Sequence, residues 1–550
     1  MKHLIPFALA AAAAGQACMA QALTARAAAR FLDQATWGPS PGSIAYLQSI
    51  GIDKWLAIQF AMKTSDLPDQ PILTPAGTSN NNLAPVQAAF FQNAVMGPDQ
   101  LRQRVAFVLS QIWVVSATSG VPNAYAYPPY WRIFRDNAFG NYRDVIKAVT
   151  LNPAMGRYLN MANNNKGDPT KGTAANENYA RELMQLFTLG LTQLNLDGSA
   201  VVDANQNPVP TYDQNVVTNV AKMLTGWTYP TAPQATPKTN NPAYYLGQMF
   251  AVESEHDTSA KTIFNNLQIP AMQTAGQDLN SLLDALMQHP TMAPFISQQL
   301  IEHLVTSNPS PGYIQRVAQV FRNDGTGVTG NLQAVIRAIL TDPEARAGDA
   351  SPNAIPPTFG HLREPILFVT NVLRGLGAEV DAGCEMEAET ESRREMHRRG
   401  QEERGATAGN LAYSCSNAAA ASAANLGQNL FNAPSVFSYF SPQSRTEHGL
   451  LGPEFQIYST QTAASRADLV NTILYGRLGG IKVDLGPYVA LAGNAANLLD
   501  SIASVFLHGS MSPQLETEAT AAVNAAPTPL AKAQAALYIA LTSAEYQIVQ

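Results

Sequence analysis

The sequence predicts a predominantly α-helical fold, in which a large multi-helix globular body carries a small β-hairpin insertion. Apolar residues recur three and four positions apart over much of the chain, which is the spacing of an amphipathic helix. Segments with the alternation of a strand are few and short. Hydrophobic residues make up 46% of the 550 residues and charged residues only 14%, a composition that favours a packed globule over a disordered chain or a coiled coil.

The first residues have the features of a secretory signal peptide. A positive start at residues 1–3 precedes an apolar stretch over 4–14 and a small-residue cleavage site at 20–22. We expect cleavage after Ala22, and therefore an exported protein that works in the periplasm or outside the cell. No later run of about 18 apolar residues follows, so no transmembrane segment is predicted in the mature chain.

The helical prediction begins with a hairpin of two helices. Apolar residues have helical spacing over 25–37 and 44–60, and Pro39 and Pro41 separate the two stretches. The same spacing predicts helices at 101–115, 142–159, 177–189, 215–225, 279–288, 293–305, 311–322, 332–340 and 363–376. The alanine-rich, amphipathic residues 495–550 are also expected to be helical.

The β-hairpin is predicted at residues 200–202 and 209–212, on either side of Asn205-Gln206-Asn207. Segments rich in Pro, Asn, Thr or Ser predict linkers at 65–85, 230–242 and 347–357. With the signal peptide at 1–22, the chain divides into a main helical body at 23–380, a charged insertion at 381–408 and a helical part at 409–550. We expect this last part to be continuous with the main body.

Two cysteines remain after removal of the signal peptide. Cys384 and Cys415 bracket the most charged segment of the chain, residues 385–404, in a compartment where disulfides persist. A bridge between them would restrict the unfolded chain and contribute a few kcal/mol. The alternative is a pair of free thiols.

Charge and motif content exclude several classes of function. The 34 basic and 41 acidic residues give a formal net charge of -7, with no basic surplus to neutralise a phosphate backbone, so nucleic acid is not expected as a partner. The chain has no G-x-S-x-G elbow, no Walker loop and no dinucleotide-binding G-x-G-x-x-G in the required context. No cofactor or metal can be named from the sequence.

The first candidate for catalysis is a polar helix start. Glu177 and Arg181 lie four residues apart and share a helix face, and Glu182 follows directly. In a functional interpretation Arg181 keeps one acid ionised while the other acts as general acid or base. The alternative is a capped helix with an ordinary ion pair.

The second candidate lies in the polar segment Glu253-Ser254-Glu255-His256-Asp257. His256 and Asp257 are able to bind a divalent metal or supply a base, although the second ligand spacing of an H-E-x-x-H helix is absent. A surface loop is the alternative. His303, which follows Glu302 on an apolar helix, and His361, three residues before Glu364, are interpreted as core or helix-end residues with metal binding as the lesser alternative.

Two groups of aromatic residues suggest either sugar-stacking platforms or plugs that hold a loop on the core. One group is Tyr125, Tyr127, Tyr130 and Trp131; the other is Phe437, Tyr439 and Phe440. Both lie close to prolines, which favours the core interpretation.

Several motifs, in order along the chain, resemble those of the bacterial "domain of unknown function 1800" proteins. They are AARFLDQATWGPS (28–40), RVAFVLSQIWVVS (104–116), NPAMGRYLN (152–160), ENYARELMQLFTLGL (177–191), PTYDQNVV (210–217), LTGW (224–227), REP (363–365), FNAPSVFSYFSP (431–442) and the closing LTSAEYQIVQ. The resemblance implies one continuous helical body and gives no residue a catalytic role.

Members of that family look like exported proteins often encoded beside a sulfatase-like family, so the resemblance implies a sulfatase-like exported partner. We therefore expect an envelope accessory or binding factor that acts with such a partner. The alternative is an exported hydrolase, directed at polysaccharide, that uses Glu177, Arg181 and Glu182 with His256 and Asp257. A structural or adhesion protein without a deep polar pocket is the third hypothesis.

Overall fold

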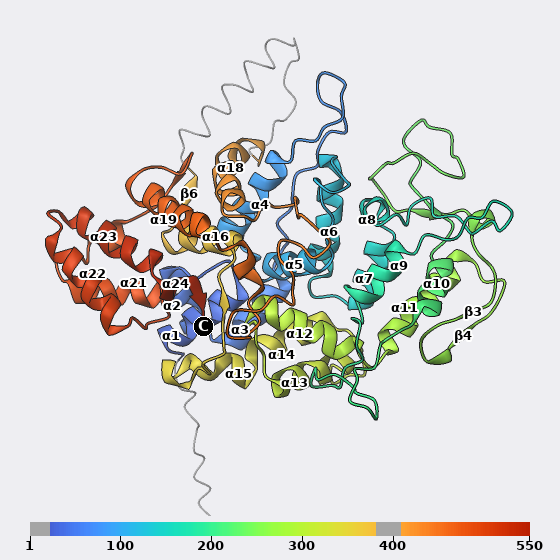
Figure 1. Cartoon of the computed structure of the whole chain (residues 1–550). Helices are drawn as coiled ribbons and strands as arrows, with labels where there is room; N and C mark the ends of the chain where they lie inside the picture. Colours follow the sequence, from blue (N-terminus) through green and yellow to red (C-terminus); the bar gives the residue numbers. More distant parts are fainter. Residues whose placement is uncertain (1–22, 381–408) are drawn as a thin grey trace, which may run out of the picture.

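The computed structural model describes residues 23–380 and 409–550, which form a broad assembly of helices (Figure 1). The predicted signal peptide, the charged insertion at 381–408 and Cys384 lie outside the described residues, as does the side chain of Cys415. The predicted disulfide therefore stays a prediction.

The described residues confirm a predominantly helical fold. The first half contains α1 (Ala25–Ala35), α2 (Pro41–Ile50), α3 (Ile52–Ala61), α4 (Ala84–Met96), α5 (Gln100–Ile112), α6 (Tyr127–Asn137), α7 (Tyr142–Thr150), α8 (Pro153–Tyr158), α9 (Asn178–Gln185), α10 (Gln214–Met223) and α11 (Ala275–Gln288). The second half contains α12 (Met292–Leu304), α13 (Pro311–Arg322), α14 (Leu332–Thr341), α15 (Pro343–Arg346), α16 (Pro365–Gly375), α18 (Gly409–Asn425), α19 (Thr460–Tyr475), α20 (Gly486–Val489), α21 (Ala495–Phe506), α22 (Pro513–Ala525), α23 (Pro529–Thr542) and α24 (Ala544–Gln547).

The strands form small antiparallel pairs of two residues each. They are β1 (Trp227–Thr228) with β2 (Phe250–Ala251), β3 (Lys261–Thr262) with β4 (Gln268–Ile269), β5 (His361–Leu362) with β8 (Ile548–Val549), and β6 (Glu379–Val380) with β7 (Ile481–Lys482). The predicted hairpin is present as isolated bridges, among them Val202 to Pro208. The pair β5–β8 joins the last residues of the chain to its middle.

The helices pack in neighbouring groups around a shared interior. In Figure 1, α21 to α24 lie at one end of the molecule and α9 to α11 at the other, with α5 and α12 between them. Buried apolar side chains from Ala28 to Tyr546 belong to one contiguous hydrophobic core. Helix α18 packs on α4, so residues after position 409 are part of this body.

Two predicted helices are broken in the structure, and this corrects their expected length. The helix predicted at 44–60 stops at Gly51, whose φ of +77° is left-handed, and a separate helix, α3, begins at Ile52. The helix predicted at 142–159 is interrupted before Pro153, which starts α8 as its first residue. A glycine with positive φ and a proline thus end a helix even where the apolar pattern continues.

Helices α4, α6, α18 and α19 were not predicted from the sequence pattern. Helix α6 contains Tyr127, Tyr130 and Trp131, all buried, and Tyr125 is buried just before it. This group of aromatic residues therefore belongs to the core.

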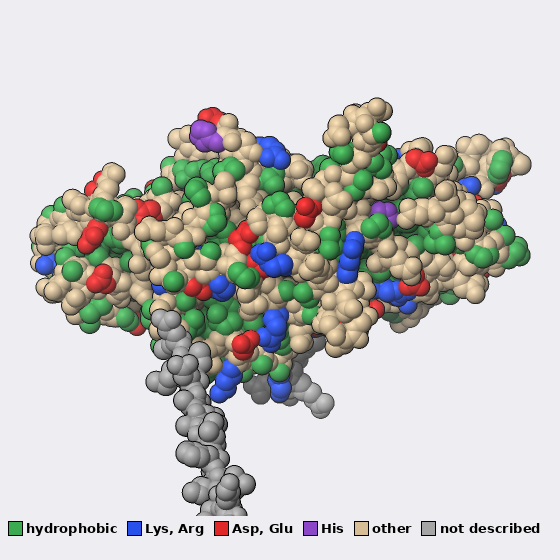
Figure 2. Space-filling view, turned by 90° about the horizontal axis from the view of Figure 1, so that it is seen from below, with side chains coloured by type: hydrophobic (Ala, Val, Ile, Leu, Met, Phe, Trp, Pro, Cys, Tyr) green, Lys and Arg blue, Asp and Glu red, His purple; other side chains and the backbone are tan. Residues whose placement is uncertain are grey.

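The surface carries both signs of charge. On the face shown in Figure 2, acidic and basic side chains are interspersed among polar and apolar ones. Within residues 23–380 and 409–550, no helix combines the length and apolar character needed to cross a membrane.

Candidate active site

The carboxylate of Glu177 connects α9 to α10. Glu177 is the residue before α9, and its carboxylate lies 3.1 Å from the guanidinium of Arg181. Gln214 and Thr218 of α10 donate hydrogen bonds to the same carboxylate, at 2.8 to 3.0 Å. A carboxylate that already has these donors holds α9 against α10, as the structural interpretation of the ion pair expects.

His256 lies in the protein interior. Its Nδ1 is 2.9 Å from the carbonyl oxygen of Thr225, and its Nε2 is 3.2 Å from a carboxylate oxygen of Asp278 on α11. The ammonium of Lys261 lies 2.7 Å from the same oxygen, and the side chains of all three ionisable residues are fully buried. This cluster fastens the segment before β3 to α11, and the side chain of His256 is fully buried within it.

Asp257 lies at the edge of that cluster, with its carboxylate 3.8 Å from the ammonium of Lys261. Its carboxylate accepts hydrogen bonds from the backbone and hydroxyl of Ser259, which together with the charges of Lys261 and Lys222 lower its pKa, although burial opposes the shift. These are the contacts of a local turn.

The five predicted residues do not converge on one site. Glu177 contacts Gln214, the first residue of α10, whereas the backbone N–H of Asp257 donates to the hydroxyl of Thr225, just past the other end of that helix. The ten residues of α10 span roughly 15 Å at the rise of an α-helix. The Glu177 pair and the His256 segment therefore lie at opposite ends of α10.

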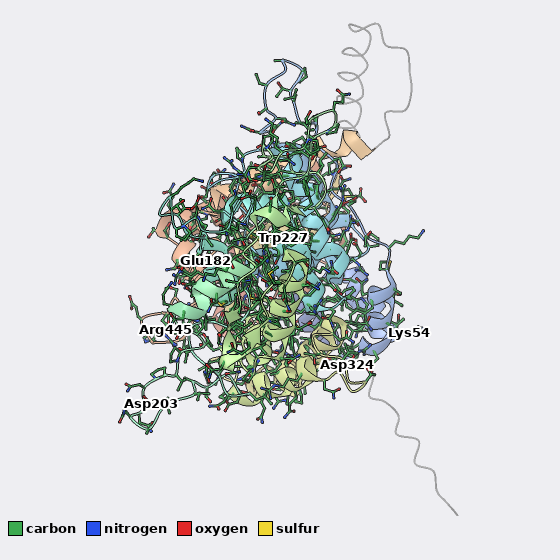
Figure 3. All side chains as sticks on the ribbon, turned by 90° about the vertical axis from the view of Figure 1, so that its right-hand side faces the viewer. Lys54, Glu182, Asp203, Trp227, Asp324 and Arg445 are labelled. Carbon is green, nitrogen blue, oxygen red and sulfur yellow. The ribbon has the colours of Figure 1, made fainter. Side chains whose placement is uncertain are left out.

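Glu182 differs from the other four residues, because burial raises the pKa of its carboxyl group. It lies one helical turn before Leu186, which lines a pocket described below. Figure 3 shows Glu182 on the same side of the molecule as Arg445 and away from Lys54. Arg445 belongs to the hairpin that leads into that pocket.

The pocket lies where α5, α9 and α12 meet the segment 436–454. It is a cavity of about 60 Å³, and three carboxylate or imidazole side chains line it, those of Glu302, His303 and Glu454. Polar and apolar neighbours complete the wall: Gln111, Ile112, Leu186, Gln299, Ser307, Val436, Phe437, Ser438, Phe440, Pro442 and Pro453. This volume accommodates a few water molecules or one edge of a larger ligand.

Glu302 is the most perturbed acid of the pocket. Burial raises the pKa of its carboxyl group to about 8; the hydrogen bond from Gln298, at 2.7 Å, opposes the shift, and the negative charge of Glu454 adds to it. The residue is partly exposed as a whole and lines the cavity. A carboxyl group of this kind is protonated at neutral pH and is able to donate a proton.

Glu454 faces the same cavity from the 3-10 turn Pro453–Ile457. It is buried, with 5% of its area exposed, and one carboxylate oxygen lies 3.7 Å from Nδ1 of His361. The other oxygen has no hydrogen-bond partner within the described part of the chain.

His303 also lines the cavity, and further ionisable groups lie close to it. Burial lowers the pKa of His303 to about 3, and the positive charge of Arg104 adds to this shift, so its imidazole is neutral at physiological pH. Arg104 donates to the carbonyl oxygen of His303 at 2.7 Å. Glu364 accepts from Gln111 and Gln428 at 3.3 and 2.5 Å, and burial raises its pKa.

The sequence singled out some residues of this site but did not predict that they surround one pocket. His303, His361 and Glu364 attracted attention as histidines and a neighbouring acid, whereas Glu302 was only the residue before His303 and Glu454 was not singled out. The usable signal was an acidic residue next to a run of apolar ones, since α12 buries Leu300, Ile301 and Leu304 around it. The residues that the structure describes contain no group of three or more His, Cys, Asp and Glu able to hold a metal ion.

Comparison with known proteins gives a family and nothing more specific. No curated protein and no solved structure matches the chain. The family model described as "Protein of unknown function (DUF1800)" matches residues 30–548, nearly the whole chain. The resemblance carried by the sequence motifs is thereby confirmed, and the chain belongs to this family.

Proposed function

We propose that this protein is a hydrolase in which Glu302 is the general acid and Glu454 the general base. The observation that supports the proposal best is the carboxyl group of Glu302, which lines the cavity with its pKa raised to about 8. Functional sites are where burial and a like charge combine to shift a carboxyl group this far.

The proposed reaction is the hydrolysis of a C–O bond. Water attacks the carbon while Glu454 takes one of its protons, and Glu302 gives its proton to the leaving oxygen as the old bond breaks. Glu454 ends protonated and Glu302 ionised, and exchange of one proton with solvent restores both. His361 is a positioning residue for the carboxylate of Glu454.

The test uses the mature chain from Leu23 onward and a panel of chromogenic glycosides and esters. Glu302→Gln removes the proton donor and is expected to lower kcat roughly 10²- to 10⁴-fold with little change in KM. The wild-type kcat/KM is expected to fall above about pH 8, where Glu302 loses its proton.

Glu518→Gln is the matched control. Glu518 accepts a hydrogen bond from Gln514 four residues earlier, as Glu302 does from Gln298, but it lies exposed on α22. Equal turnover by the Glu302→Gln variant and the control would contradict the proposal.

The accessory-factor hypothesis makes a different prediction. A factor that acts with a sulfatase-like exported partner has no need of a raised-pKa acid beside a cavity, and the pocket therefore favours the hydrolase. Co-purification of the chain with such a partner under mild conditions, from cells that produce both, would restore the accessory role.

We also propose that the protein is exported, on the basis of its first 22 residues. N-terminal sequencing of the protein from the periplasmic or culture fraction is expected to begin at Leu23. Recovery of the chain with Met1 in the cytoplasmic fraction would contradict export.

A further inference from the structure

Four polar side chains that line the pocket have atoms without a hydrogen-bond partner within the described part of the protein. They are Oε1 of Gln111, Nε2 of Gln299, Oγ of Ser307 and Oε2 of Glu454. Gln111, Ser307 and Glu454 are at least nine-tenths buried. A buried polar atom needs a partner, so these atoms indicate the chemistry of what enters the cavity.

The four atoms include both donors and acceptors. Gln299 offers an N–H, Gln111 and Glu454 offer acceptor oxygens, and the Ser307 hydroxyl does either. A sulfate or phosphate group only accepts, and it would leave the oxygens of Gln111 and Glu454 unpaired. A ligand rich in hydroxyl groups both donates and accepts at each position, and it satisfies the whole set.

The charge of the pocket also disfavours an anion. Its lining contains no Lys or Arg, and the neutral His303 supplies no positive charge. Arg104 is buried behind His303, and Arg445 donates to the carbonyl oxygen of Gly449 within its own hairpin. An anionic group would meet the carboxylate of Glu454 with no compensating cation among the lining residues.

An aromatic ring lies at the rim of the pocket. Phe437 is 44% exposed although it is a large apolar residue, whereas the neighbouring Phe440 is buried. The turn that presents Phe437 contains Ser438, which is buried with a left-handed φ of +66°. The C–H face of a sugar ring packs on an exposed aromatic ring of this kind.

We infer that the pocket binds a neutral, polyhydroxylated sugar ring at the end of a glycan, with its hydroxyl edge on Gln111, Gln299 and Ser307 and its face on Phe437. This inference rests on the proposed function, because it names the substrate of the Glu302 site. The small cavity takes the edge of one ring, and the rest of the glycan lies outside it.

The test measures binding, separately from turnover. Fluorescently labelled Glu302→Gln protein, in its mature length, is applied to an array of neutral, uronate-containing and sulfated oligosaccharides. We expect retention on neutral glycans and not on their sulfated or uronate counterparts. Adding Phe437→Ala is expected to weaken retention roughly tenfold, the effect of losing one aromatic contact.

Phe250→Ala is the control, because Phe250 is similarly exposed, at 38%, but lies on β2 outside the pocket. Preferential binding of anionic glycans, binding to no neutral glycan, or equal loss in the two phenylalanine variants would overturn the inference. Neutral glycan binding with undiminished hydrolysis by Glu302→Gln protein would instead contradict the proposed catalytic role and leave the binding site in place.

Discussion

Asp33 shows how single residues of the shared motifs stabilise the interior. Its two carboxylate oxygens accept hydrogen bonds from Arg363 at 2.7 and 2.8 Å, and Nε2 of His508 lies 2.9 Å away. Burial alone would raise the pKa of Asp33, but the charge of Arg363 and these hydrogen bonds hold it well below its usual range. Asp33 and Arg363 belong to two of the sequence motifs, so these motifs are explained by core structure.

Replacing Asp33 with Asn is therefore expected to destabilise the protein strongly. The change leaves the buried guanidinium of Arg363 without its counter-charge, which costs about 3 to 5 kcal/mol. Urea unfolding at pH 7 measures the loss. The matched control is Asp53→Asn, because Asp53 also pairs with an arginine, Arg337, but its side chain is 91% exposed; we expect a change below about 1 kcal/mol there.

The same substitution has a pH signature. A carboxyl group whose pKa is depressed on folding stabilises the protein above its unfolded value of about 3.9, and this contribution is lost as the pH falls further. The difference in unfolding free energy between wild type and Asp33→Asn is thus expected to shrink below about pH 4. A difference that stays constant down to pH 2 would contradict the assigned charge state.

The pKa of Glu302 shifts on folding in the opposite direction to that of Asp33, and this shift gives a test of Glu302 that needs no substrate. Its folded pKa of about 8 exceeds the unfolded value of about 4.3, so between these values the folded protein binds the extra proton. Wild-type stability is expected to decline as the pH rises through this window, and Glu302→Gln is expected to remove that part of the decline. Identical slopes for Glu302→Gln and Glu518→Gln would show that Glu302 titrates normally.

Residues of this kind were only partly predictable. Glu177 and Arg181 were found because helical spacing brings them together within one turn. Glu302 and Glu454 meet through the tertiary fold, and no local spacing encodes that encounter. The ionisation of Glu302 depends on burial, which a single sequence does not report.

At the scale of elements, helices with strong apolar periodicity were predicted closely. Helix α13 has the predicted bounds, Pro311–Arg322, because Ser310 caps its start and proline occupies its first position. Helix α4 was missed beside a Pro- and Asn-rich linker, and its apolar residues are spread around the helix without a single stripe. Apolar periodicity therefore predicts helices that bury one face better than helices such as α4, which bury several faces.

The ion pair between Lys261 and Asp278 allows the attachment of β3 to α11 to be tested. Lys261 in β3 gives the carboxylate of Asp278 its cationic partner at 2.7 Å, with both side chains fully buried. Lys261→Met leaves that carboxylate uncompensated and is expected to cost about 3 to 5 kcal/mol of unfolding free energy in urea.

Lys171→Met provides the comparison, since Lys171 pairs with Asp168 at 2.9 Å but is 76% exposed. Its loss is expected to cost less than about 1 kcal/mol. Similar stabilities for the two methionine variants would mean that Lys261 does not hold β3 to α11, and His256 would again be open to a functional interpretation.

At the scale of the whole molecule, the length of the chain allowed several domains, whereas the family resemblance predicted one continuous helical body. In the described residues, the main hydrophobic core has members from α1 to α24, and a small second cluster contains Val114, Ala433, Tyr439 and Phe440. Phe506 of α21 comes so close to Gly375 of α16 that a Cβ at this glycine would collide with the aromatic ring. Asp33, Arg363 and His508 join the beginning, middle and end of the chain at one point. This connectivity favours cooperative unfolding.

The positions of the tryptophans allow that cooperativity to be measured. All five lie between Trp37 and Trp227, so their fluorescence reports the first half of the chain, whereas far-UV circular dichroism also reports α19 to α24. We expect the two signals to unfold at the same denaturant concentration. Leu537→Ala, at a fully buried position of α23, is expected to lower the free energy of unfolding by about 2 to 5 kcal/mol. Its midpoint should fall in the fluorescence signal as well as in the circular dichroism signal. Leu530→Ala on the same helix, where the side chain is 48% exposed, should shift neither signal appreciably. If Leu537→Ala moves only the circular dichroism transition, the C-terminal helices unfold as a separate domain.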